Sequence, residues 1–325
     1  MRVIRALTAV LAMAVSASLF PGSDADAQEW PAKAVRMVVP QPPGINDTIT
    51  RLIAQRLSAK FGQPFVVENR PGAGGNIGTD IVAKAAPDGY TLVLSSSGPL
   101  TSNKFLYKPM PFDAIRDLTP IILVCVIPGI LAANSGVQVK NLKELADLAH
   151  ARPGQLSVGS PGTGTNTHLG IELYKQLAKA DLLHVPFKGA VGAMTNVMAG
   201  NVQLALAMVP DYVKPIQAGK LKGLAVFSRA RFPALPDVPT AIEQGFDMEV
   251  AASDALMGPA GLPRPIVDKI NHELNEYLKS PEGKTRLDQI GVTVIGGPPE
   301  RVKSMIEREW SVWKPVIDSA GVKMN

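Results

Sequence analysis

Short apolar runs alternate with segments of helical periodicity along most of the chain. After the first strand, Ile49, Leu52, Ile53 and Leu57 recur at the spacing of one helix face. The apolar runs predict strands at 35–39, 65–67, 90–94, 156–158, 183–187, 202–207, 221–227 and 249–257. This alternation of strands and helices is typical of an α/β fold with a mostly parallel sheet.

Helix starts are marked by polar residues that can cap the free N–H groups. Asn141 and Glu144 form a capping-box pattern that predicts a helix start at Asn141. Asp47 is expected to cap the helix after the first strand. Two further helices are predicted near the C-terminus, from Val267 and from Val302.

The first 27 residues have the features of a signal peptide. Arg2 and Arg5 precede an apolar run over 6–19, which is shorter than the roughly 20 residues needed to span a bilayer. The small residues Ala25 and Ala27 then flank Asp26, and this A-x-A pattern is typical of a signal-peptide cleavage site. We expect cleavage near Ala27 and a mature protein in the periplasm.

Length and composition narrow the class of protein. The chain has 325 residues, enough for about two domains, and carries a net charge of +5. Because the charges are dispersed and aromatic residues make up only 5%, nucleic-acid binding is not expected. Cys125 is the single cysteine and should be a small buried apolar residue. The four histidines lack metal-ligand spacing, so neither a metal nor another cofactor is predicted.

Glycine-rich segments do not match the common catalytic or nucleotide motifs. A dinucleotide fingerprint from Gly72 would need glycine where Ile77 stands, and a nucleophile elbow at Ser160 would need glycine in place of Val158. We therefore expect that the protein is not an enzyme. The loops 40–47 and 160–166 instead offer hydroxyl and N–H groups at helix starts, which can hold an anion or can simply cap the helix.

Several segments together carry a resemblance to a known family. They are Trp30–Lys33, Val38–Gly44, Val66–Gly78, Ala86–Leu92, Gly159–Leu169, Val185–Gly189 and Leu235–Thr240. In these segments the chain resembles the extracytoplasmic solute receptors of tripartite tricarboxylate transporters, the Bug family. The resemblance implies a type II periplasmic-binding-protein fold, with two α/β lobes joined by a two-stranded hinge. Residues 28–128 and 249–325 would form lobe 1, and residues 129–248 would form lobe 2.

The resemblance also implies a ligand site between the lobes. One ligand carboxylate would be held by two loops, through Pro43, Gly44, Ile45 and Asn46 and through Ser160, Thr163, Gly164, Thr165 and Asn166. Ser96, Ser97, Lys188, Gly189 and Asp211 would surround the rest of the ligand. Lys188 could equally be a solvated loop lysine.

Two segments depart from the family pattern. The first loop is one residue short, with Ile45 where a second glycine is usual, and Ile45 does not take a positive φ without strain. The segment from Ala251 to Asp254 lacks an aromatic residue that is common at the hinge. A different path of the first loop would change the carboxylate contact that the resemblance implies.

The expected function is capture of a small carboxylate, such as a di- or tricarboxylate, an acidic amino acid or an aromatic acid. Hinge closure around the ligand would precede delivery to membrane subunits of a tripartite tricarboxylate-type transporter. A monomer is expected. Two alternatives stay open from the sequence: a ligand-sensing partner of a histidine kinase, and a secreted serine hydrolase.

Overall fold

The computed structural model describes residues 29–324, so the predicted signal peptide lies outside the described residues. The strands are β1 (Val35–Val39), β2 (Phe65–Asn69), β3 (Thr91–Ser96), β4 (Leu118–Asn134), β5 (Leu156–Ser160), β6 (Leu182–Pro186), β7 (Leu204–Met208), β8 (Leu221–Val226), β9 (Ala251–Pro259) and β10 (Thr293–Val294). The helices are α2 (Ile45–Phe61), α3 (Asn76–Ala83), α4 (Ser97–Leu100), α5 (Asn103–Leu106), α6 (Leu142–Ala151), α7 (Asn166–Ala178), α8 (Ala190–Ala199), α9 (Val209–Gln217), α10 (Arg264–Lys279), α11 (Pro281–Ile290) and α12 (Glu300–Ala320), with short 3₁₀ turns η1 (Ala73–Gly75) and η2 (Ile242–Gln244).

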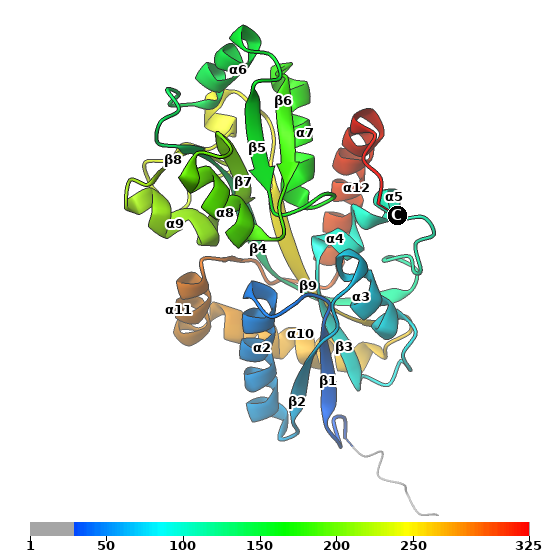
Figure 1. Cartoon of the computed structure of the whole chain (residues 1–325). Coiled ribbons are helices and arrows are strands. Elements are labelled where there is room, and N and C mark those ends of the chain that lie inside the picture. Colours follow the sequence, from blue (N-terminus) through cyan, green and yellow to red (C-terminus); the bar gives the residue numbers. More distant parts are fainter. Residues whose placement is uncertain (1–28, 325) are drawn as a thin grey trace, which may run out of the picture.

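The strands form two mixed sheets that share β4. The first sheet has the order β2-β1-β3-β9-β4, with β10 also paired to β4. The second has the order β6-β5-β7-β4-β8, because β8 also pairs with β4. Each sheet contains a strand that crosses from the other half of the molecule: β9 lies between β3 and β4 in the first sheet, and β4 lies between β7 and β8 in the second. Figure 1 shows the two sheets as separate lobes with helices around them, which confirms the predicted α/β class.

Strand β4 changes partners halfway along its length. Its first part, up to Pro128, pairs with β9, and its second part, from Gly129, pairs with β7 and β8. Proline has no N–H to donate, so Pro128 suits the point where one ladder ends. The chain returns beside this point, where the N–H of Gly129 donates to the carbonyl of Val250 at 2.7 Å. The sequence analysis did not predict β4 as a strand.

Apolar side chains cover both faces of each sheet. In the first sheet, Met37 packs with the cluster under α2 and α10, and its neighbour Val38 packs with the cluster under α3 and α12. This follows from the alternation of side chains along a strand. In the second sheet, one cluster includes α6 and α7 and the other includes α8 and α9. Each lobe is therefore a three-layer structure with its sheet in the middle.

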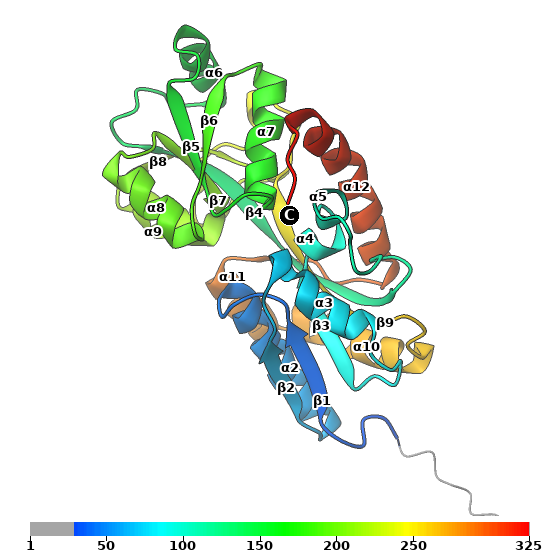
Figure 2. The ribbon, with the colours of Figure 1, turned by 45° about the vertical axis from the view of Figure 1, so that its right-hand side comes forward.

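Helix α12 connects the two cores, as Figure 2 shows on the side where the C-terminus lies. Near its start, Val302 and Ile306 pack in the core of the first sheet. Near its end, Trp313 and Ile317 pack in the core of the second sheet. The boundaries that place all of 249–325 in lobe 1 do not anticipate this crossing. We retain the division into lobes as a proposal, with α12 as a strut between them.

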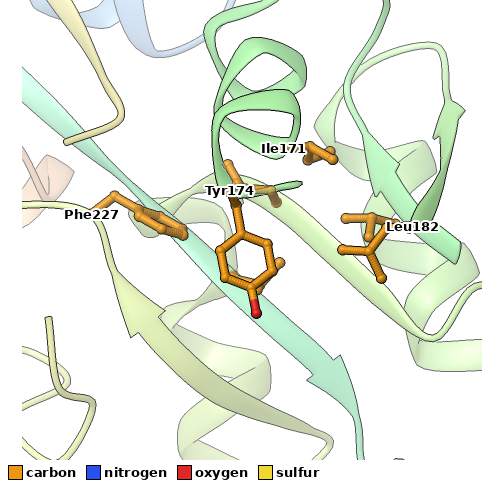
Figure 3. Close-up of a pocket in the computed structure, with 7 residues that line it drawn as sticks. Ile171, Tyr174, Leu182 and Phe227 are labelled. Atoms are coloured by element: carbon orange, nitrogen blue, oxygen red, sulfur yellow. The ribbon is translucent and has the colours of Figure 1, made fainter. Parts of the chain in front are cut away.

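The core of the second sheet contains a narrow gap between side chains. Ile171, Tyr174, Leu182 and Phe227 line it, and Figure 3 shows them converging from α7, β6 and the segment after β8. All four are at most 2% exposed, and the gap is too small to hold a water molecule. Because it is apolar and too narrow for water, this gap is part of the core and not a ligand site.

Replacing Trp313 with alanine tests the role of α12. Trp313 is 2% exposed, so Trp313→Ala should lower the free energy of unfolding by about 3–5 kcal/mol. The adjacent Val312 is 39% exposed. Val312→Ala should therefore change the free energy of unfolding by less than about 0.5 kcal/mol. Chemical denaturation measures both. Equal, small losses would show that the end of α12 does not contribute to the second core.

Candidate functional site

The first loop of the candidate site leads directly into α2. Gly44 occupies the N-cap position and provides no side chain to cap the helix. The expectation that Asp47 caps this helix is therefore wrong. Asp47 lies in the first turn, where its carboxylate accepts from Arg51 Nε at 2.8 Å and Nη2 at 2.9 Å. Ile45 is the first helical residue and needs no positive φ, while Pro43 and Gly44 are exposed.

Asn46 joins this loop to the hinge strand β9. Its Nδ2 donates to Asp254 Oδ1 at 2.7 Å, and Asp254 has no exposed surface. The other oxygen, Oδ2, lies 4.0 Å from the thiol of Cys125, which is buried as predicted. Burial raises the pKa of Asp254 to about 7, although the Asn46 hydrogen bond lowers it. The two segments that depart from the family pattern are thus in direct contact.

The serines at the end of β3 point in different directions. Ser95 is buried beside Thr79, with 3.2 Å between their hydroxyl oxygens. Ser96 Oγ accepts from Gln41 Nε2 at 2.6 Å, which connects it to the first loop. Ser97 Oγ accepts from Asn166 Nδ2 at 2.9 Å. Ser96 and Ser97 therefore lie toward the junction, whereas Ser95 supports α3.

In the second lobe, the hydroxyl groups of the 160–166 loop mostly hold the loop itself. Ser160 Oγ lies 2.7 Å from His184 Nε2, and Thr165 caps α7 by accepting from the N–H of His168 at 3.2 Å. Gly164 has a φ of 75°, and an added Cβ would lie 3.2 Å from Leu106 Cδ1. Thr163 is exposed. Within this loop, Thr163 presents the most accessible hydroxyl side chain.

Asn166 is the direct link between the two lobes. Besides Ser97, its Nδ2 donates to the carbonyl of Ala251 at 2.7 Å, and the N–H of Ser253 donates to Ser97 Oγ at 3.3 Å. Asn166 and Ser97 are 69 residues apart in sequence. The structure therefore brings predicted site residues of both lobes together beside the hinge strand.

The start of α8 lies beside the same loop. The N–H of Phe187 donates to the carbonyl of Ser160, and the N–H of Gly189 donates to the carbonyl of Pro161, both at 2.9 Å. Gly189 is the N-cap of α8 and has no side chain to cap it, and Lys188 is exposed. A helix start that lacks a side-chain cap leaves N–H groups available to an anion.

Asp211 lies in the first turn of α9. It keeps an exposed surface, but its surroundings limit its hydration enough to raise the pKa of its carboxyl group. Among residues 29–324, no hydrogen bond or ion pair connects Lys188 or Asp211 to the other predicted site residues. Their part in a ligand site therefore stays a prediction.

His168 and His184 stack on each other with 3.8 Å between their ring centroids. Burial lowers the pKa of each to about 4, so both rings are neutral at neutral pH. Ser160 beside them has no exposed surface. Because a substrate carbonyl cannot reach its hydroxyl, the Ser160–His184 hydrogen bond supports the loop and does not form a catalytic pair.

Two buried acids near the hinge were missed from the sequence. Asp254 interrupts an apolar strand, which is a signal that could have been used. Glu309 lies on α12, where its Oε2 accepts from Thr101 Oγ1 at 2.9 Å and its Oε1 accepts from Ser253 Oγ at 3.3 Å. Burial raises the pKa of Glu309 to about 7. A glutamate on an amphipathic helix gives no comparable sequence signal.

The described part of the chain contains no group of three or more side chains placed to hold a metal ion. None of the helices within residues 29–324 is both long and apolar enough to cross a membrane.

The fold and this junction define a class of protein before any comparison is made. The chain forms two α/β lobes joined by two crossing segments, and hydroxyl groups and helix starts lie at their junction. This architecture is typical of a periplasmic-type binding protein. A sequence model of the family described as "Tripartite tricarboxylate transporter family receptor" matches residues 49–322. The chain belongs to this family, whose members are solute-binding receptors and not enzymes.

Known relatives cover almost the whole chain. Protein BugT of Bordetella pertussis is 35% identical over 92% of this chain and 92% of its own length. The structure of R. palustris Rpa4515 with adipate has a TM-score of 0.81 and 33% identity, covering 91% of this chain and 99% of that one. MatC from Rhodopseudomonas palustris with bound malate has a TM-score of 0.76 and 32% identity, covering 89% and 100%. These matches confirm the predicted type II binding-protein fold.

Glu309 makes the stability of the protein depend on pH. Its pKa is raised from 4.5 to about 7 on folding, so the folded state holds a proton that the unfolded state releases. This contribution is fully present below about pH 4.5 and is lost as pH rises to about 7. We expect Glu309→Gln to become more stable relative to wild type by about 2–3 kcal/mol between about pH 5 and 8.

The matched control is Glu307→Gln, an exposed position on the same helix. Denaturant unfolding of all three proteins at each pH gives the differences directly, which removes the opposing contribution of His168 and His184. If Glu309→Gln and Glu307→Gln follow the same pH curve relative to wild type, the assigned role of Glu309 is wrong.

Proposed function

We propose that this protein is a periplasmic receptor that captures a small carboxylate between its lobes and delivers it to a tripartite tricarboxylate-type membrane transporter. The predicted signal peptide and the periplasmic relatives support the location. Family membership supports the transport role. The adipate and malate bound to two relatives support a ligand with carboxylate groups.

One structural observation carries the proposal. Two helix starts without side-chain caps, at Gly44 of α2 and Gly189 of α8, belong to different lobes. The start of α2 is tied to β9 through Asn46 and Asp254. The loop before α8 bonds to the 160–166 loop, which Asn166 in turn ties to β9. A carboxylate placed between the two helix starts would accept hydrogen bonds from N–H groups of both lobes. Each helix dipole would add about 0.3–1 kcal/mol to the binding free energy.

Lys188 supplies an exposed positive charge to this arrangement. It immediately precedes the N-cap of α8, and its ammonium group is exposed. A second ligand carboxylate that reached it would gain a charge-assisted hydrogen bond. Asp211 lies on the neighbouring α9. If it is ionised, it would repel any negatively charged ligand group placed next to it.

Closure is the second part of the proposal. Within residues 29–324, the chain passes between the two sheets along β4 and again just before β9, so the lobes can rotate about the region of Gly129 and Val250. Contacts made to the ligand by both lobes would favour the closed form. Small-angle scattering should show a smaller radius of gyration with saturating ligand, and an unchanged curve would contradict closure.

A melting-temperature screen of the purified chain tests the ligand class. Adipate, malate, citrate, glutamate and nicotinate would be compared with their amides. A ligand at about 100 times its dissociation constant should stabilise the protein by about 2.7 kcal/mol. A shift with an acid and none with its amide supports a carboxylate receptor, whereas a panel without shifts contradicts it.

A variant pair then tests the second-lobe contact. Lys188→Ala should weaken the binding of a dicarboxylate found in the screen by about tenfold or more, because a charge-assisted hydrogen bond is lost. The control is Lys220→Ala, which removes an exposed lysine from the turn after α9 and should leave the dissociation constant unchanged. Calorimetric titration measures both. Equal affinities for the two variants would remove Lys188 from the site.

A further inference from the structure

Asp254 is a buried carboxyl group with an incomplete set of hydrogen-bond donors. Its side chain has no exposed surface. Asn46 provides a donor to Oδ1 at 2.7 Å, while Oδ2 faces only the weak thiol donor of Cys125 at 4.0 Å. A buried carboxylate is stable only when its oxygens are well supplied with donors, so this environment favours the protonated form of Asp254 more than water does.

Asn46 is the partner through which Asp254 reaches the ligand site. It lies in the first turn of α2, directly after the exposed Gly44, and keeps part of its surface exposed. An ionised Asp254 can only accept, so it must bind the NH₂ group of Asn46. The amide oxygen of Asn46 is then the atom left for other partners. A protonated Asp254 can instead donate to this oxygen, which leaves the NH₂ group free.

We propose that Asp254 is a positioning residue that decides which side of the Asn46 amide faces the ligand, so that a carboxylate binds with the uptake of one proton. With Asp254 ionised, Asn46 presents an oxygen, which repels a carboxylate. With Asp254 protonated by a proton from solvent, Asn46 turns its amide and donates N–H to the carboxylate. This inference rests on the proposed function, because it places the ligand at the start of α2.

The surroundings of Asp254 contain few other groups that can titrate near neutral pH. The thiol of Cys125 stays protonated, because burial and Asp254 raise its pKa. Neither β3 nor α4 carries an ionisable side chain. Three helices near β9 or Asn46 also carry ionisable groups: Asp80 on α3, which pairs with Lys84; Asp47 on α2, which pairs with Arg51, together with Arg56 and Lys60; and His168, Glu172, Tyr174 and Lys175 on α7. On α12, the ionisable residue that bonds to β9 is Glu309, through Ser253.

Burial raises the pKa of Glu309 to about 7, as it does for Asp254. It reaches Ser253 and Thr101 and makes no hydrogen bond to Asn46 or Asp254. Glu309→Gln is therefore the matched control for Asp254→Asn. The two variants remove similar titrations, one on β9 itself and one on α12, where Glu309 accepts a hydrogen bond from Ser253 beside Asp254. Of the two residues, only Asp254 contacts Asn46.

The orientation of Asn46 can be tested without any ligand. In ligand-free protein, the side-chain amide signals of Asn46 in a nitrogen–proton correlation spectrum should shift with pH, with a midpoint near 7. The shift should persist in Glu309→Gln and vanish in Asp254→Asn. Signals that stay constant in wild type between about pH 6 and 8, or that still titrate in Asp254→Asn, would overturn the inference.

Calorimetric titration with adipate and malate tests the consequence for binding. The dissociation constant should rise about tenfold from pH 6 to 8 in wild type and in Glu309→Gln, and less than about twofold in Asp254→Asn. An equal slope in all three proteins would overturn the inference. If wild type binds no carboxylate at either pH, the proposed function fails, and the amide titration still decides the role of Asp254.

Discussion

The two lobes depend on one strand that must satisfy hydrogen bonds in two sheets. β4 pairs with β9 up to Pro128 and with β7 and β8 from Gly129 onward. Because its backbone groups are committed on both sides of this point, the lobes cannot shift along each other without breaking a ladder. Rotation about the point itself breaks none. The same strand thus restricts the motion of the lobes and permits the one motion that a binding protein needs.

Hydrogen-bonded polar groups cluster where this motion would occur. Asn166, Ser97 and Ser253 exchange hydrogen bonds at the hinge, and the acids Asp254 and Glu309 lie on or against β9. Apolar packing in this place would make the junction more rigid, since moving it would open cavities or expose apolar surface. Polar groups can instead change partners at a small net cost. The junction is therefore adapted to rearrangement at some expense of stability.

The sequence predicted the regular parts of the fold well, because strands such as β1 and helices such as α2 carry clear periodic signals. It did not predict β4, whose side chains are buried on both faces and show neither period. The loops of the candidate site were located, but not the contacts within them. Asn46 and Asp254 are 208 residues apart, and no local pattern can indicate such a hydrogen bond. Asp47 was assigned to the wrong position because Gly44 starts the helix three residues earlier.

The position of β9 has a consequence for the order in which the protein can assemble. β9 lies between β3 and β4 in the first sheet, yet it follows the whole second lobe in sequence. During synthesis, the second sheet has all its strands once β8 has been made. In the first sheet, the edges of β3 and β4 that pair with β9 stay unpaired until Pro259 has been made, and β10 joins β4 later still. The lobe that begins the chain is therefore completed last, and a chaperone that binds the nascent protein would find its open edges there.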